Sequence, residues 1–129
     1  MKEVSAALVI KEGKIFIAQR PEGKPLPNLW EFPGGKLEEG ETLEQCLKRE
    51  IKEELSLDVE VGDFIMDTTY SYPNGEFKIN LYRTYFPENA EPKLNVHQKF
   101  AWVAPEDLDN YEFPPADMDI IRHLKTMNL

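Results

Sequence analysis

The chain has 129 residues, of which 41% are hydrophobic, and its formal net charge at pH 7 is −9. This length suits one domain with a single core. The negative charge argues against a nucleic-acid polymer as partner, because sequence-independent binding to DNA or RNA requires a basic surface. No apolar run approaches the roughly 18 residues of a membrane-spanning helix, and the first residues have a strand pattern rather than that of a signal peptide. With a single cysteine, Cys46, an internal disulfide is excluded. We therefore expect a cytoplasmic protein with no membrane partner.

The first third of the chain has the pattern of short strands. Val4–Ile10 and Lys14–Gln19 alternate around a glycine turn and are predicted to form a hairpin. Pro21–Asn28 contains three prolines and a glycine, so we expect a loop there. Leu29–Phe32 is predicted to form a further short strand that runs into two glycines.

A helix is predicted to begin after Thr42 and to end at about Leu55. Thr42 and Gln45 have the spacing of a capping box, in which each side chain accepts a bond from the backbone N–H of the other residue. The helix should therefore begin sharply at this point.

The second half of the chain predicts strands and a final helix. Val59–Tyr72 and Glu76–Phe86 flank an Asn-Gly turn signal, and Phe100–Val103 is a further strand. The last helix should open at the prolines that follow Phe113. Its apolar side is predicted to contain Met118, Ile121, Leu124 and Met127. This order of elements predicts an α/β protein with a mixed β-sheet between helices.

Three glutamates of the first helix are placed unfavourably for an ordinary solvated face. At about 100° per residue, Glu50 and Glu54 point to within about 20° of Leu43, inside the apolar arc, and Glu53 lies at its edge. Carboxylates turned towards a core are costly unless something neutralises them. Mg²⁺, which prefers oxygen ligands, would neutralise them; the alternative is a glutamate-rich amphipathic helix without a ligand.

The spacing of these residues matches a known motif. Gly35 is followed after five residues by Glu41, and after seven more by the run Arg49–Leu57, REIKEELSL. This resembles the Nudix box, G-x5-E-x7-R-E-U-x-E-E-x-G-U, in which U is aliphatic, at every position except Ser56, where the family has glycine. The chain is thus identified by resemblance as a Nudix hydrolase. The resemblance implies an α/β/α sandwich and a single Nudix domain over residues 1–129.

Three flanking segments are similar to the MutT subgroup of this family. They are Asn28–Lys36 with the sequence NLWEFPGGK, Tyr72-Pro73, and Phe113–Asp117 with FPPAD, where the subgroup typically has FPPAN. The resemblance implies a nucleoside triphosphate pyrophosphohydrolase that converts NTP and water to NMP and pyrophosphate. Its cofactor would be Mg²⁺, or Mn²⁺ in its place, and its partner a small nucleotide substrate. We expect a monomer or a weak homodimer.

The resemblance also implies roles for single residues. The metal ligands would be the carboxylates of Glu50, Glu53 and Glu54, together with the backbone carbonyl of Gly34. Glu50 is the first choice of general base for the attacking water, and Glu53 is the second. Arg49 would orient the carboxylates of the box.

Glu41 is the expected partner of Arg49 in the catalytic group. Arg20 and Lys36 match positions that face the phosphates of the substrate, although each of these two could also be an ordinary solvated charge. Phe32 and Tyr72 are expected to line the base pocket, although lone aromatics are more often core residues.

Asp117 should bias the choice of base. Ionised, its carboxylate only accepts hydrogen bonds, so it suits the amino group of cytosine, whereas asparagine also suits 8-oxoguanine. We therefore expect activity on cytidine triphosphates or modified pyrimidine nucleotides alongside 8-oxo-dGTP, since a protonated Asp117 could also read 8-oxoguanine.

Two positions depart from the family pattern. Val96 stands where the MutT pattern often has a further metal-binding glutamate in a segment like E-H-Q, which leaves the number of metal ions open. His97 beside it is expected to be structural or solvent-facing. Ser56 should occupy the left-handed conformation that glycine usually takes after a helix.

Other functions are compatible with the box. An ADP-ribose or other nucleoside-diphosphate-sugar pyrophosphatase would use the same motif, but the flanking segments disfavour it. A non-catalytic nucleotide-binding regulator, or a purely structural acidic domain, would retain the fold without the chemistry. A regulator is expected to have substitutions among the three box glutamates, and this chain has none.

Overall fold

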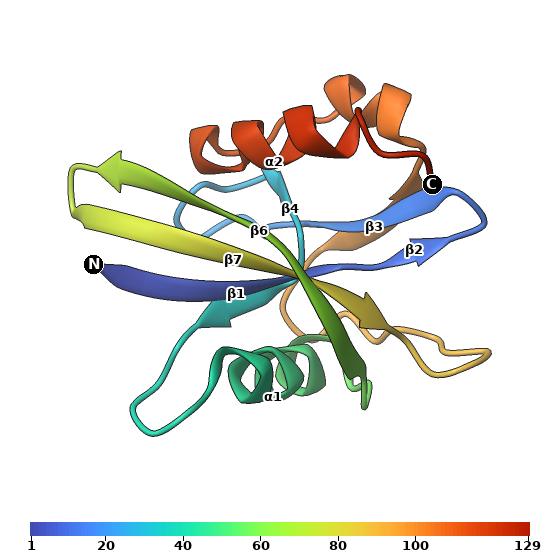
Figure 1. Cartoon of the computed structure of the whole chain (residues 1–129), viewed down its shortest axis with the longest axis horizontal. Helices are drawn as coiled ribbons and strands as arrows, with labels where there is room; N and C mark the ends of the chain where they lie inside the picture. Colours follow the sequence, from blue (N-terminus) through green and yellow to red (C-terminus); the bar gives the residue numbers. More distant parts are fainter.

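Two four-stranded sheets form the centre of the molecule, and a helix covers each side (Figure 1). The computed structural model describes all 129 residues. In the first sheet, β1 (Lys2–Leu8) pairs parallel with β7 (Gly75–Tyr85) and antiparallel with β5 (Gly34–Lys36). β6 (Glu60–Tyr72) pairs antiparallel with β7 at the open edge. This sheet is therefore mixed, as predicted.

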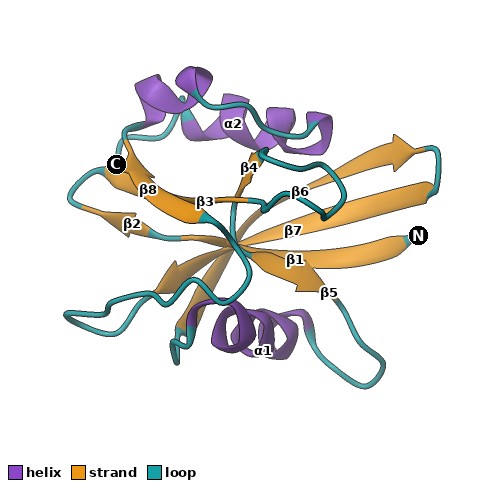
Figure 2. Cartoon of the chain, turned by 180° about the vertical axis from the view of Figure 1, so that it is seen from behind, coloured by secondary structure: helices purple, strands orange, loops and turns teal.

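The second sheet is antiparallel and is organised around β3 (Lys14–Gln19). β3 pairs with β2 (Ile10–Lys11), with β4 (Trp30–Glu31) and with β8 (Lys99–Val103). The long loop between β7 and β8 runs past the end of α1 (Figure 2).

The predicted hairpin of Val4–Ile10 with Lys14–Gln19 is largely wrong. The first strand ends at Leu8 and pairs with β7 and β5 in the other sheet, and only the two residues of β2 pair with β3. The reason lies in the run Ala6–Val9, which is buried at every position. A strand covered on both faces belongs in the middle of a sheet, next to a parallel neighbour, rather than in a surface hairpin.

Alternate residues of β1 and β3 pack into opposite cores. Ala6 and Leu8 contact one core with α2 (Met118–Leu124), whereas Ala7 and Val9 contact the other with α1 (Leu43–Leu55). Successive strand residues point to opposite faces, so one strand contributes to both layers. The architecture is the expected α/β/α sandwich.

The helix termini agree with the sequence only in part. Thr42 and Gln45 form the predicted capping box, and Ser56 is left-handed with φ 57°. The last helix, however, begins at Met118 after a 3₁₀ turn over Pro115–Asp117, and a second 3₁₀ turn spans Pro105–Asn110. Met118, predicted to lie on the apolar side, is the first residue of the helix and is exposed.

The buried residues of the last helix are Ile120, Ile121 and Leu124. Met127 lies beyond the helix end and packs against the same core. Neither helix is long and apolar enough to cross a membrane.

Candidate active site

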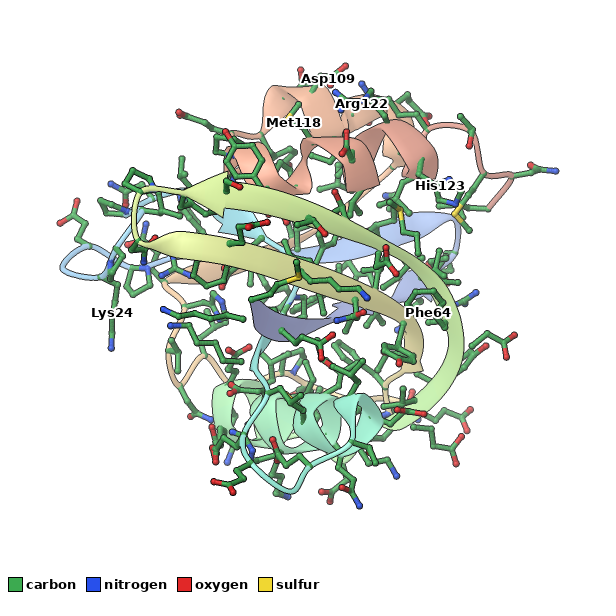
Figure 3. All side chains as sticks on the ribbon, turned by 60° about the vertical axis from the view of Figure 1, so that its left-hand side comes forward. Lys24, Phe64, Asp109, Met118, Arg122 and His123 are labelled. Carbon is green, nitrogen blue, oxygen red and sulfur yellow. The ribbon has the colours of Figure 1, made fainter.

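A pocket of about 370 Å³ opens between the first sheet and the loops that flank it. Its lining joins β1, β4 and β5 to the end of α1 and to the turn before α2. The loop after β3 contributes Lys24, which projects outwards in Figure 3. This volume and this mixture of apolar walls with a few charged groups are typical of a small-molecule site.

The helix α1 places two carboxylates against the glycine backbone of β5. The Glu54 side chain is buried, and its Oε1 accepts a bond from the backbone N–H of Gly34 at 3.3 Å. The Glu50 carboxyl carbon would lie 2.2 Å from a Cβ added at Gly35, so a larger residue there would displace this carboxylate. At Gly34, where φ is +155°, an added Cβ would lie 1.9 Å from the carbonyl oxygen of Ser5. Gly35 thus allows Glu50 to approach β5 closely, and Gly34 allows β5 to pack against the backbone of β1.

Arg49 connects the remaining carboxylates of this cluster. Its Nε lies 2.7 Å from Glu41, as expected, and its Nη1 lies 3.0 Å from Glu50 and 3.3 Å from Glu53. Its Nη2 also donates to the backbone carbonyl of Lys36. These bonds raise the pKa of Arg49 and lower that of Glu41. The guanidinium therefore holds the first turns of the motif together as one unit.

The most buried glutamate of the cluster has no cationic partner that would favour its ionised form. Burial raises the pKa of Glu54 to about 9, with further increases from the nearby Glu31 and Glu50. Burial also raises the pKa of Glu50, although its bond to Arg49 opposes this. Glu54 forms no ion pair with any cationic side chain of the chain.

Carboxylate and carbonyl oxygens fit a hard divalent cation by their chemistry, and a bound cation would favour the ionised form of both glutamates. Glu50, Glu54 and the Gly34 backbone lie together, and Glu53 is next to them but turned towards Arg49 and half exposed. No three acidic, histidine or cysteine side chains already converge as a closed metal cluster.

A second buried acid, Asp117, lines the same pocket. Asp117 is 7% exposed, and burial together with the nearby Glu31 raises its pKa to about 7, while Arg20 opposes the shift. The Tyr72 hydroxyl oxygen accepts a bond from the backbone N–H of Ala116, and the Phe32 ring stacks on Phe113 with centroids 5.5 Å apart. This part of the pocket therefore offers aromatic walls and one acidic side chain.

Comparison with known proteins agrees with this geometry. The sequence model of the NUDIX domain matches residues 5–123. The chain belongs to the Nudix family.

Two bacterial enzymes are similar to this Nudix protein over nearly its whole length. A CTP pyrophosphohydrolase of Escherichia coli is 35% identical over 94% of the chain and 89% of the relative. An 8-oxo-dGTP diphosphatase of Haemophilus influenzae is 35% identical over 95% of the chain and 90% of the relative. The solution structure of the E. coli ORF135 protein superposes with a TM-score of 0.81 at 32% identity, covering 95% of this chain and 86% of that one.

The fold gathers most of the predicted Nudix site residues in one pocket. Those that line it are Arg20, Phe32, Gly34, Lys36, Glu54, Tyr72 and Asp117. The other predicted residues, Glu41, Arg49, Glu50 and Glu53, form the adjoining network along α1. The structure thus brings the predicted set together, and the catalytic and binding role of each residue stays a prediction.

Two pocket residues were missed from the sequence. Glu31 accepts a bond from Arg20 at 2.9 Å, and its second oxygen lies 2.7 Å from Nε2 of His97. His97 was expected to be structural or solvent-facing, yet its side chain is buried and lines the pocket. Glu31 belongs to the MutT-like segment before the box, which was the available signal. Nothing in the sequence indicated that His97 would contact Glu31, which lies 66 positions before it in the chain.

Proposed function

We propose that this Nudix protein is a Mg²⁺-dependent nucleoside triphosphate pyrophosphohydrolase that acts on 8-oxo-dGTP and on cytidine triphosphates. The observation that carries the proposal is the pocket, which is lined both by the buried Glu54 of the Nudix helix and by the buried Asp117 of the turn before α2. Relatives named CTP pyrophosphohydrolase and 8-oxo-dGTP diphosphatase support the same substrate classes.

The residues of α1 would prepare the water for attack. Glu50, Glu53, Glu54 and the Gly34 carbonyl would hold Mg²⁺, which when bound supplies charge neutralisation on the phosphoryl oxygens. Glu50 accepts the proton of the water whose oxygen attacks the β-phosphorus. The bond from the β-phosphorus to the oxygen that bridges it to the α-phosphorus breaks. NMP leaves with that oxygen, and the β- and γ-phosphoryl groups leave as pyrophosphate with the oxygen of the water. The Arg49 contact at 3.0 Å favours the ionised form of Glu50, which a general base requires.

The two cations predicted to face the phosphates differ in their partners. Lys36 forms no ion pair, and its Nζ lies 5.8 Å from the centre of the Phe77 ring, beside the pocket. Arg20 is already committed to Glu31 and to the backbone carbonyl of Pro25. We therefore assign the phosphate contact to Lys36 and the orientation of Glu31 to Arg20.

Asp117 and Glu31 would read the base. The carboxylate of Glu31 is contacted by two donors, Arg20 and His97, and acts as an acceptor. Asp117 forms no ion pair, and its side chain can be neutral or charged near pH 7. A protonated Asp117 donates to the O6 of 8-oxoguanine, and an ionised Asp117 accepts from the amino group of cytosine. One pocket can thus accept both classes of nucleotide.

A hydrolysis panel tests the proposal. The purified protein with Mg²⁺ is given CTP, dCTP, 8-oxo-dGTP, the four ordinary dNTPs and ADP-ribose, and the products are identified by phosphorus NMR. We expect NMP and pyrophosphate from the first three. Preferential cleavage of ADP-ribose would support the sugar-nucleotide alternative instead. Nucleotide binding without any turnover would support the non-catalytic regulator.

A further inference from the structure

The two histidines of the chain have very different surroundings. The side chain of His97, in the loop between β7 and β8, is 1% exposed and lines the pocket. His123 is exposed on α2, on the far side of the molecule from the loop that carries Lys24 (Figure 3). Only His97 can therefore influence what enters the pocket.

Packing alone does not account for an imidazole at position 97. Its Nδ1 is buried and has no hydrogen-bond partner. An unpartnered buried polar atom destabilises the fold, and an apolar side chain of similar size would avoid this penalty. The polar contact of the ring is made by Nε2, which lies 2.7 Å from Oε2 of Glu31. Because a carboxylate accepts hydrogen bonds, the imidazole N–H is the donor.

His97 and Arg20 hold the same carboxylate from two directions. Arg20 Nη1 donates to Oε1 of Glu31 at 2.9 Å, and Arg20 Nε donates to the backbone carbonyl of Pro25 at 2.8 Å. Each oxygen of Glu31 therefore has its own donor. A carboxylate bound in this way presents its remaining lone pairs in a fixed direction.

The backbone on both sides of His97 is fixed as well. The N–H of Asn95 donates to the carbonyl of Glu54 at the end of α1, and the N–H of Gln98 donates to the carbonyl of Gln19 in β3. The imidazole thus projects from a segment that is anchored to two different elements. Such anchoring is what a positioning group requires.

We propose that His97 is a positioning residue that sets the direction in which Glu31 presents its acceptor oxygens to the nucleotide base. This rests on the proposed function, in which Glu31 and Asp117 read the base. A fixed acceptor favours an N–H on the base edge and disfavours a second acceptor. It therefore favours cytosine, with its N4 amino group, over uracil, with O4. It also favours 8-oxoguanine, with N7–H, over guanine, whose N7 is an acceptor.

The test uses two matched substrate pairs, CTP with UTP and 8-oxo-dGTP with dGTP. The kcat/KM of each is measured in the wild type, His97→Gln and His97→Asn. The glutamine amide reaches the place of Nε2, whereas the shorter asparagine does not. We expect His97→Asn to lower the preference for the N–H member of each pair about tenfold, the scale of one misdirected polar contact. His97→Gln should stay within about threefold of the wild-type ratio, and His123→Asn should change nothing.

A residue with a purely structural role would give another pattern. If His97→Asn lowers all four kcat/KM values equally, or if His97→Gln loses the preference as fully as His97→Asn, the inference is overturned. Wild-type turnover without any preference within the pairs overturns it as well. If the wild type hydrolyses none of the triphosphates, the proposed function itself fails. Should His97→Asn not fold, His97→Phe replaces it, because a phenyl ring fills similar space without a donor to Glu31 and should produce the same loss of preference.

Discussion

Two carboxylate clusters meet at the pocket, one along α1 and one at Glu31 and Asp117, and they are assembled in opposite ways. Glu50, Glu53 and Glu54 project from one helix, so their spacing in the sequence is enough to bring them together. Glu31 and Asp117 come from β4 and from the turn before α2, and only the packing of sheet against helix makes them neighbours.

Each cluster nevertheless leaves one carboxylate without a cation. Arg49 bonds Glu41, Glu50 and Glu53 but not Glu54, and Arg20 with His97 bonds Glu31 but not Asp117. The unpaired members are those with a strongly raised pKa, about 9 for Glu54 and about 7 for Asp117. We infer that the helical cluster is completed by a metal ion and the second cluster by a proton. The following predictions test that division.

The largest expected effect is on turnover at the helical cluster. Glu50→Gln removes the proposed general base and one metal ligand, so kcat should fall by at least the roughly 10²–10⁴-fold typical of acid–base catalysis. The melting temperature without metal should stay the same or rise slightly, because a buried charge is lost. Glu44→Gln, at an exposed glutamate of the same helix, is the matched control. A near-normal kcat in Glu50→Gln would transfer the base role to Glu53.

Metal binding should stabilise the folded protein through the first cluster only. A ligand at a hundred times its Kd adds about 2.7 kcal/mol to the free energy of unfolding, so millimolar Mg²⁺ should raise the melting temperature. The increase should shrink in Glu53→Gln and Glu54→Gln but persist in Asp117→Asn. It is measured by differential scanning calorimetry with Mg²⁺ and with a chelator. No increase, combined with activity that is indifferent to the chelator, would contradict the metal interpretation.

The second cluster should make base preference depend on pH. Because the pKa of Asp117 is raised to about 7, the group is protonated below that pH and ionised above it. Raising the pH from 6 to 8 should therefore move the ratio of kcat/KM values from 8-oxo-dGTP towards CTP. Asp117→Asn should remove this pH dependence and favour 8-oxo-dGTP by about tenfold.

Comparing a ratio within one enzyme cancels the titration of the general base, which affects both substrates alike. A ratio that is unchanged by pH and by Asp117→Asn would remove this residue from base recognition. A pH dependence that persists in the variant would assign the titration to another group.

The contrast between a cluster on one helix and a cluster assembled by packing also explains what the sequence could and could not predict. The capping box, the left-handed Ser56 and the contact of Arg49 with Glu41 are local or follow from a fixed spacing, and the structure confirms them. The hairpin prediction failed because alternation cannot reveal that Ala6–Val9 is buried on both faces. Glu31 and His97 were missed because their contact depends on the antiparallel pairing of β3 with both β4 and β8.

The smallest expected effect concerns Ser56, where the family has glycine. A non-glycine residue in the left-handed conformation costs about 1 kcal/mol, so Ser56→Gly would stabilise the protein if nothing else changed. In the structure, however, Ser56 Oγ accepts a bond from Asn95 Nδ2 at 2.9 Å, and the same nitrogen donates to the Glu53 carbonyl at 3.0 Å. One net hydrogen bond contributes about 0.5–1.5 kcal/mol, which offsets the conformational gain.

We therefore expect Ser56→Gly to lie within about 0.5 kcal/mol of the wild type in urea unfolding, and Ser56→Ala to lose about 1 kcal/mol because it retains the strain without the bond. In an Asn95→Ala background the bond is already absent, so Ser56→Gly should there show its full gain of about 1 kcal/mol. A full gain in the wild-type background would mean that the Asn95 contact contributes nothing. The double-mutant cycle matters beyond stability, because Asn95 lies at the junction of the two clusters: it bonds the end of the glutamate helix and stands two residues before His97.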